Sequence, residues 1–92
     1  DMLLMVVERF RSGRPEEVGA RFRASGRLIP EGAEIEFVES WMSLDGTCCY
    51  QLMRAPAPDA LQPWLDAWSD LVEFEVLPVV PSAEFWAGDR WR

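Results

Sequence analysis

Hydrophobic and polar positions along the first third of the chain predict a strand followed by a helix. Residues 2–7 form an unbroken apolar run, Met-Leu-Leu-Met-Val-Val, which is typical of a strand buried on both faces. Pro15 then opens a helix whose first turn carries Glu16 and Glu17, where negative charge suits the helix dipole. Gly26 is expected to end that helix.

The middle of the chain predicts a β-hairpin. Residues 34–42 alternate between apolar and polar side chains, which places Phe37 and Trp41 on the same face of a strand. The dipeptide at 45–46, Asp-Gly, is a strong turn signal, and residues 47–53 return as an apolar, β-branched and aromatic strand.

The last third predicts a second helix and a fourth strand. Asp59 is the candidate N-cap of the helix. Its inner face is bulky and aromatic, because apolar residues recur at helical spacing at Leu61, Trp64, Trp68 and Leu71. Residues 72–80 alternate as a strand, and residues 82–86 are long enough for one short helical turn.

The order of elements is therefore strand, helix, strand, strand, helix, strand. Two right-handed crossovers joined by a hairpin give a ferredoxin-like βαββαβ fold of the α+β class. We expect a four-stranded antiparallel sheet with both helices on one face, in a single domain over residues 1–92.

The first strand also predicts an assembly. Its side chains are apolar in both directions, so one face would be an exposed apolar patch larger than a soluble monomer normally shows. We expect a homodimer through the sheet face opposite the helices. The alternative is that residues 85–91 fold back over that face.

Composition narrows the possible partners and cofactors. The chain has nine arginines, no lysine, no histidine and a net charge of −7, which argues against nucleic acid and anionic membranes as partners. Without histidine, a haem or zinc site is not expected, and Cys48 and Cys49 are interpreted as inert thiols, so we expect no cofactor and no metal. No secretory signal or membrane-spanning run is seen, which favours the cytoplasm.

Several segments resemble a family of short bacterial proteins of unknown function. They are residues 2–10, 18–27, 46–53 and 64–82, and the likeness is most specific in Gln51-Leu52-Met53 and in residues 68–78. The resemblance implies membership of the dimeric α+β barrel group, whose members include small-molecule monooxygenases, chlorite dismutase-like haem proteins and stress-responsive proteins. The fold therefore does not choose a function, and the family supplies no catalytic motif to carry over.

Four aromatic residues are candidates for a ligand pocket. Trp41 and Tyr50 lie on the two hairpin strands as possible cross-strand neighbours, while Trp64 and Trp68 face the sheet from the second helix. Together they would wall an apolar site for a flat molecule. The alternative is that they are core packing.

Polar residues embedded in apolar strands are the candidates for acid–base chemistry. Glu8, Gln51 and Glu75 belong to this set, with Arg9, Glu39 and Glu73. A carboxylate that points into a closed space would have a raised pKa and act as an acid or base. The alternative is a solvated rim, or ion pairs with arginines.

These features lead to two functional hypotheses. The first is a small homodimeric protein that binds an apolar or aromatic molecule between sheet and helices. The second is a cofactor-independent monooxygenase or isomerase that acts on an aromatic metabolite. A fully packed space around the aromatic candidates would contradict both.

Overall fold

The computed structural model describes residues 1–92. Its elements, in chain order, are β1 (Met2–Phe10), α1 (Glu16–Ser25), β2 (Glu36–Met42), β3 (Cys48–Ala55), the 3-10 turn η1 (Pro58–Leu61), α2 (Gln62–Asp66), β4 (Val72–Val79) and α3 (Ser82–Ala87). This order confirms the predicted βαββαβ arrangement, to which α3 is an addition at the C-terminal end.

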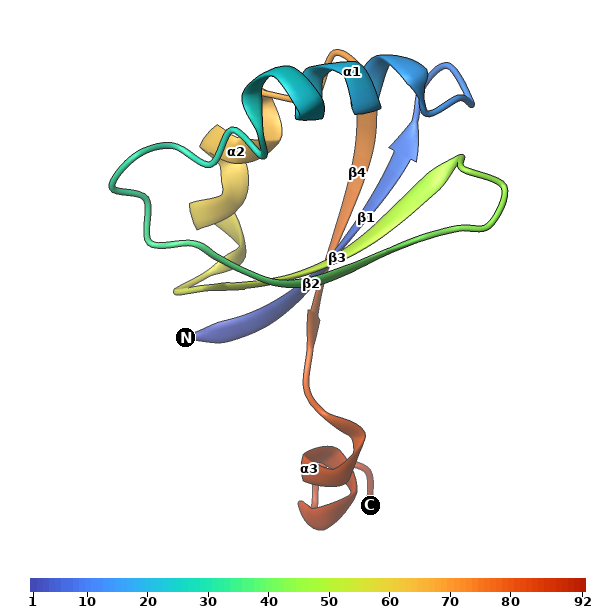
Figure 1. The fold of residues 1–92 in the computed structure, drawn as a ribbon. Coiled ribbons are helices and arrows are strands. Elements are labelled where there is room, and N and C mark those ends of the chain that lie inside the picture. The colour runs from blue at the N-terminus through green and yellow to red at the C-terminus, as the bar shows by residue number, and fades with distance from the viewer.

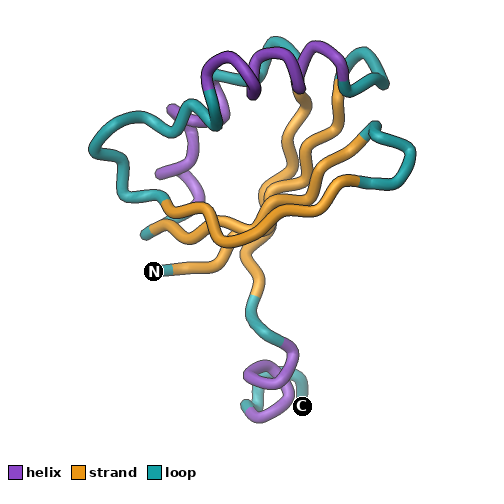
Figure 2. Tube along the Cα trace, in the orientation of Figure 1, coloured by secondary structure: helices purple, strands orange, loops and turns teal.

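The four strands form one antiparallel sheet in the order β2-β3-β1-β4. Both α1 and α2 cover the same face of this sheet, as Figure 1 shows, and the loops gather at the ends of the strands (Figure 2). The sheet order and the placement of the helices confirm the ferredoxin-like α+β class.

The register of β1 defines two faces. The covered face, toward α1 and α2, takes Val6 and its neighbours Gln51 and Val76. The open face takes Val7 and its neighbours Tyr50 and Glu75. Because successive side chains of a strand alternate, every strand residue belongs to one of these two faces.

The hydrophobic core lies between the sheet and α2. Its largest fully buried side chains are Trp64, Leu4, Met53, Leu61, Val6 and Val72. In contrast, α1 contains no fully buried residue. The core is therefore dense beneath α2, and α1 stands farther from the strands.

A bulge in β2 overturns one prediction. Phe37 pairs with Met53 on the covered face, but the register shifts between Phe37 and Glu39, and Trp41 then pairs with Tyr50 on the open face. The prediction that Phe37 and Trp41 share a face is wrong, because one extra residue reverses the alternation that follows it.

The second helix is shorter than its apolar stripe. The regular helix ends at Asp66. The residues after it form turns, with hydrogen bonds from Trp68 N to Leu65 O (3.0 Å) and from Leu71 N to Trp68 O (3.0 Å). Asp59 lies inside η1 and caps nothing, so that prediction is wrong. The apolar stripe still faces the core as expected: Leu61, Trp64 and Trp68 are buried and Leu71 is half-buried.

The C-terminal arm, residues 80–92, does not fold back over the sheet. Figure 1 shows α3 beyond the end of β4, on the side of the sheet opposite α1 and α2. Leu77, Tyr50 and Trp41 remain exposed on the open face. The alternative in which the arm covers this face is wrong for the single chain.

Candidate functional site

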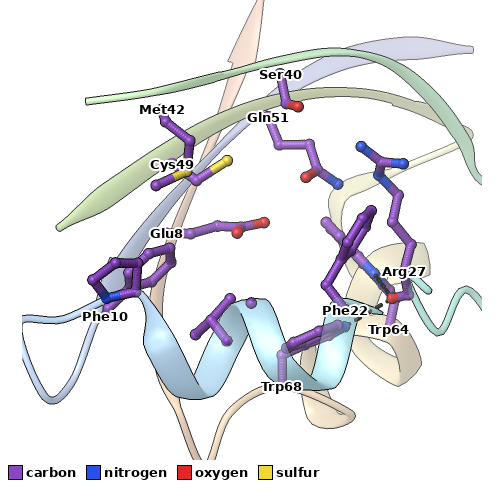
Figure 3. A pocket seen from close by; sticks show the side chains of 13 residues that line it. Glu8, Phe10, Phe22, Arg27, Ser40, Met42, Cys49, Gln51, Trp64 and Trp68 are labelled. Carbon is purple, nitrogen blue, oxygen red and sulfur yellow. Dashed lines mark hydrogen bonds between the residues drawn. The ribbon is translucent and has the colours of Figure 1, made fainter. Parts of the chain in front are cut away.

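A cavity of about 280 Å³ lies between α1 and the covered face. Its walls include Phe10, Val18, Phe22, Met42, Trp64 and Trp68. Gly19 of α1 also lines it, and a Cβ atom at Gly19 would meet no atom within 4 Å. The space that this helix leaves free is therefore an apolar pocket, and Figure 3 shows which side chains point into it.

Glu8 supplies the acid of this pocket. It lies on β1 next to Cys49 on one side and Phe74 on the other, and its carboxyl group points into the space beneath α1 (Figure 3). Burial raises the pKa of Glu8 to about 7, and the positive charge of Arg27 lowers it only in part. A carboxyl group with this pKa exchanges protons near neutral pH.

Arg27 supplies the positive charge. Its guanidinium carbon lies 3.5 Å from the centre of the Phe37 ring and 5.2 Å from that of Phe22. Its Nε atom is buried without a hydrogen-bond partner. None of the five ion pairs in the structure includes Arg27 or Glu8. The pocket thus contains a cation and an acid that do not neutralise each other.

Two tryptophans fix the backbone from which Arg27 projects. The indole N–H groups of Trp64 and Trp68 both donate to the Arg27 carbonyl oxygen, at 2.9 and 2.8 Å. The next residue, Leu28, has φ of +62°, which is uncommon for a non-glycine residue. A strained backbone persists where its surroundings over-determine it, and here the two indoles do so.

The structure brings together four of the predicted site residues. Glu8, Gln51, Trp64 and Trp68 all line the pocket. The Gln51 side chain is buried, and its amide donates only to the Met53 sulfur at 3.4 Å. A weak acceptor of this kind leaves the amide available to a better partner.

The other three predicted site residues lie on the open face. Trp41 and Tyr50 are cross-strand neighbours, but they point away from the pocket. Glu75 forms an ion pair with Arg9, with Nη1 and Oε1 3.1 Å apart. The expectation that Trp41 and Tyr50 wall a pocket with Trp64 and Trp68 is wrong, because the β2 bulge and the β3 register turn them to the open face. For Glu75 the structure shows the alternative, an ion pair with an arginine.

Sequence reasoning missed Arg27, Phe22, Ser40 and Cys49 as pocket residues. Arg27 follows α1 in a loop, where no periodicity predicts its direction. Its only sequence signal is the preceding Gly26, which has φ of +71° and ends the helix.

The cysteines do not form a bond with each other, and both are free. Burial raises the pKa of the Cys49 thiol to about 12, with a further contribution from the charge of Glu8. Cys49 is therefore a protonated, apolar part of the pocket wall. No three acidic or cysteine side chains lie close enough to hold a metal ion, and no helix has the length and apolar character needed to cross a bilayer.

The fold and the pocket define a ferredoxin-like α+β protein with a small apolar site that carries a buried acid. The chain belongs to the family described as a domain of unknown function, DUF3303, which matches residues 2–88. Searches among curated proteins and among solved structures each found no match. This match confirms one part of the resemblance predicted from the sequence, namely that the chain belongs to a family of unknown function.

Proposed function

We propose that this protein binds a small, flat, mostly apolar molecule in the pocket between α1 and the sheet. The observation that carries the proposal is a preformed apolar cavity whose lining includes three polar groups, from Glu8, Arg27 and Gln51. Ligand sites commonly combine apolar walls with a few convergent polar groups in this way.

The size of the cavity limits the ligand. A cavity of about 150 Å³ accepts benzene, and this one holds about 280 Å³. A molecule of one or two fused rings therefore fits. A hydroxyl or carbonyl group on the ring would meet the Glu8 carboxyl group or the Arg27 guanidinium, and would replace part of the hydration that these groups lose on burial.

Naphthol tests this proposal, with binding followed by fluorescence titration and by calorimetry. Gly19→Leu should abolish binding, because Gly19 lines the cavity and a Cβ atom there meets no atom within 4 Å, so the longer side chain would occupy space that the ligand needs. Ala20→Leu is the matched control, because Ala20 is the next residue of α1 and does not line the pocket. The proposal fails if naphthol does not bind, or if Gly19→Leu binds it as well as Ala20→Leu does.

We also propose that two copies associate through the open face. Its exposed apolar residues include Trp41, Tyr50, Leu77 and Val79. Leu77→Glu would place a charge within this apolar surface, and the dissociation constant of the dimer should rise by about 100-fold or more. Sedimentation equilibrium measures it, with Ala20→Glu on α1 as control. A parent chain that is monomeric at micromolar concentration would contradict the dimer.

A further inference from the structure

We propose that the pocket catalyses enolisation, the transfer of a proton to and from the carbon next to the carbonyl group of a one- or two-ring ketone, with Glu8 as the base and Arg27 beside the oxygen. This inference rests on the ligand site proposed above and narrows the second of the sequence hypotheses to proton transfer. It is carried by the position of two unpaired, oppositely charged groups in one apolar cavity.

Glu8 has the position of a base. No hydrogen bond stabilises its ionised form, and it faces the cavity rather than bulk solvent. The titratable or charged groups around it are Arg27 and Cys49. Because the Cys49 thiol remains protonated at neutral pH, a pH profile near neutrality reports on Glu8. A base with a pKa near the working pH combines a useful ionised fraction with adequate basicity.

Arg27 has the position of the group that stabilises developing negative charge. Arg27 lines the cavity and takes part in none of the five ion pairs, so its charge can stabilise an oxygen of the bound molecule without an existing ion pair being broken. Trp64 and Trp68 are positioning residues, because their indoles hold the Arg27 carbonyl and thus the origin of its side chain. Fixed donors aimed at a developing oxyanion need no reorganisation during the reaction.

The proposed step balances without an oxidant or a cofactor. The Glu8 carboxylate takes the proton, the C–H electron pair becomes the C=C π bond, and the carbonyl π pair moves to the oxygen that faces Arg27. Protonated Glu8 then returns the proton to the same carbon or, in a conjugated ketone, to the far end of the conjugated system. A monooxygenase would share the first step and would consume dioxygen in the second.

Deuterium uptake from heavy water into β-tetralone, followed by NMR, tests the activity. The parent chain should accelerate uptake with a rate that rises with pH and levels off above about 7. Glu8→Gln should lower the enzyme-dependent rate by about 100-fold or more and leave naphthol bound. Arg27→Met should lower kcat more than it changes KM, and Arg14→Met, at an exposed arginine that does not line the pocket, should retain the parent rate.

The outcomes separate this inference from the proposed function. If naphthol binds but β-tetralone exchanges no faster with the parent chain than without it, the enolisation proposal is wrong and the binding site stands. If Glu8→Gln retains the parent rate and pH profile, Glu8 is not the base. If naphthol does not bind at all, both proposals fail.

A different observation supports a second inference, that the C-terminal arm packs against a second copy of the chain. The arm carries three aromatic residues, of which Trp86 contacts the other two, with ring centres 5.1 Å apart for Phe85 and Trp86 and 5.2 Å apart for Trp86 and Trp91. Trp86 remains 59% exposed and Trp91 46% exposed. The arm projects past the open face, on the side where the sheet of a partner would stack (Figure 1).

The size of the open face explains why such an arm would be needed. Four strands of seven to nine residues cover roughly 500 Å² in projection at the usual strand spacing and rise. A specific dimer buries about 800 Å² on each partner, and each large aromatic side chain adds about 150–250 Å². In a two-fold dimer both arms would contribute equally, because the interface is the same on both subunits.

Trp86→Ser combined with Trp91→Ser tests the arm in the full chain. The dissociation constant of the dimer should rise by about 30-fold or more, as for the loss of a central aromatic anchor. Phe22→Ser, which removes an exposed aromatic ring from the other side of the sheet, should leave it unchanged. If the double variant associates as the parent chain does, the proposed arm contact is wrong and the dimer proposal stands. If the parent chain is monomeric, both proposals are wrong.

Discussion

Each face of this sheet departs at a few positions from the usual distribution of polar and apolar side chains. The covered face keeps an acid, an amide and a thiol beneath a helix, at Glu8, Gln51 and Cys49. The open face presents apolar residues to solvent, among them Leu77 and Tyr50. Burying a polar group costs free energy, and an exposed apolar patch invites association. Both departures agree with the two surfaces proposed above, one for a small molecule and one for a second copy.

Adjacent cysteines give the sharpest test of this comparison, because they lie on opposite faces. Cys49 is 8% exposed on the covered face and its pKa is raised from 9.0 to about 12. Its alkylation by iodoacetamide at pH 8 should therefore be about a thousandfold slower than that of an ordinary thiol, because the thiolate is the reactive form. Cys48, on the open face, should react first.

Mass spectrometry of the labelled Leu77→Glu variant, in which the open face is free of any partner, measures both rates. Cys48→Ser should leave a chain without a fast thiol, and Cys49→Ser should leave the fast phase intact. Equal rates at the two positions would break the assignment of the two faces.

Two tryptophans provide the next test. Trp64 is 2% exposed and fills the core, while Trp41 is 51% exposed. Trp64→Ala should lower the free energy of unfolding by about 4 kcal/mol, because it leaves a large void and removes a hydrogen bond. Trp41→Ala should lower it by less than about 1 kcal/mol. Urea unfolding at two protein concentrations separates the contribution of association, and similar losses for both variants would contradict the placement of Trp41 outside the core.

Glu8 should reduce stability at high pH. Its pKa is about 7 in the folded chain and 4.5 when unperturbed, so the folded state binds the proton more tightly. The resulting stabilisation is fully present below pH 4.5 and is lost as the pH rises through about 7. Glu8→Gln should therefore raise the free energy of unfolding by roughly 3 kcal/mol at most at pH 8, and by much less at pH 4.5. Urea unfolding at both values measures the difference. An effect independent of pH would mean that Glu8 is solvated.

The sequence predicted the order of elements because each element carries a strong local signal. Each of these signals comes from residues that are close together in the sequence. The signals are the apolar run of residues 2–7, the Asp45-Gly46 turn and the apolar stripe that includes Trp64. The turn forms as expected, with Gly46 at φ of +75° and Asp45 accepting a hydrogen bond from Thr47 N at 3.1 Å.

The pocket could be predicted only in part, for two physical reasons. One bulge in β2 moved Trp41 to the other face, and no local signal marked its position. Arg27 enters the pocket from a loop, through a backbone held by side chains from α2 and from the turn that follows it. In contrast, Glu8 and Gln51 were found because each interrupts an apolar strand.

The smallest expected effect concerns the closure of the covered face. Arg21 on α1 binds Asp70 through two contacts, Nη1 to Oδ1 at 2.8 Å and Nη2 to Oδ2 at 2.7 Å, and donates to the Ala67 carbonyl at 3.0 Å. These contacts tie α1 to the segment between α2 and β4. The hydrogen bonds from Arg21 lower the pKa of Asp70 below its usual value of 3.8. The stabilisation from this pair is therefore fully present above pH 3.8 and is lost as the pH falls through the lowered pKa of folded Asp70.

Arg21→Met should therefore destabilise the chain slightly at neutral pH and less so in acid, where Asp70 is protonated, as measured by thermal unfolding. Because α1 then closes the pocket less firmly, naphthol should also dissociate faster in stopped-flow fluorescence. Arg14→Met is the matched control, since the Arg14 to Glu16 pair, 3.1 Å apart, joins residues only two positions apart and ties no elements together. If both variants release naphthol at the parent rate, α1 stays in place without Arg21, and the entrance to the pocket lies elsewhere.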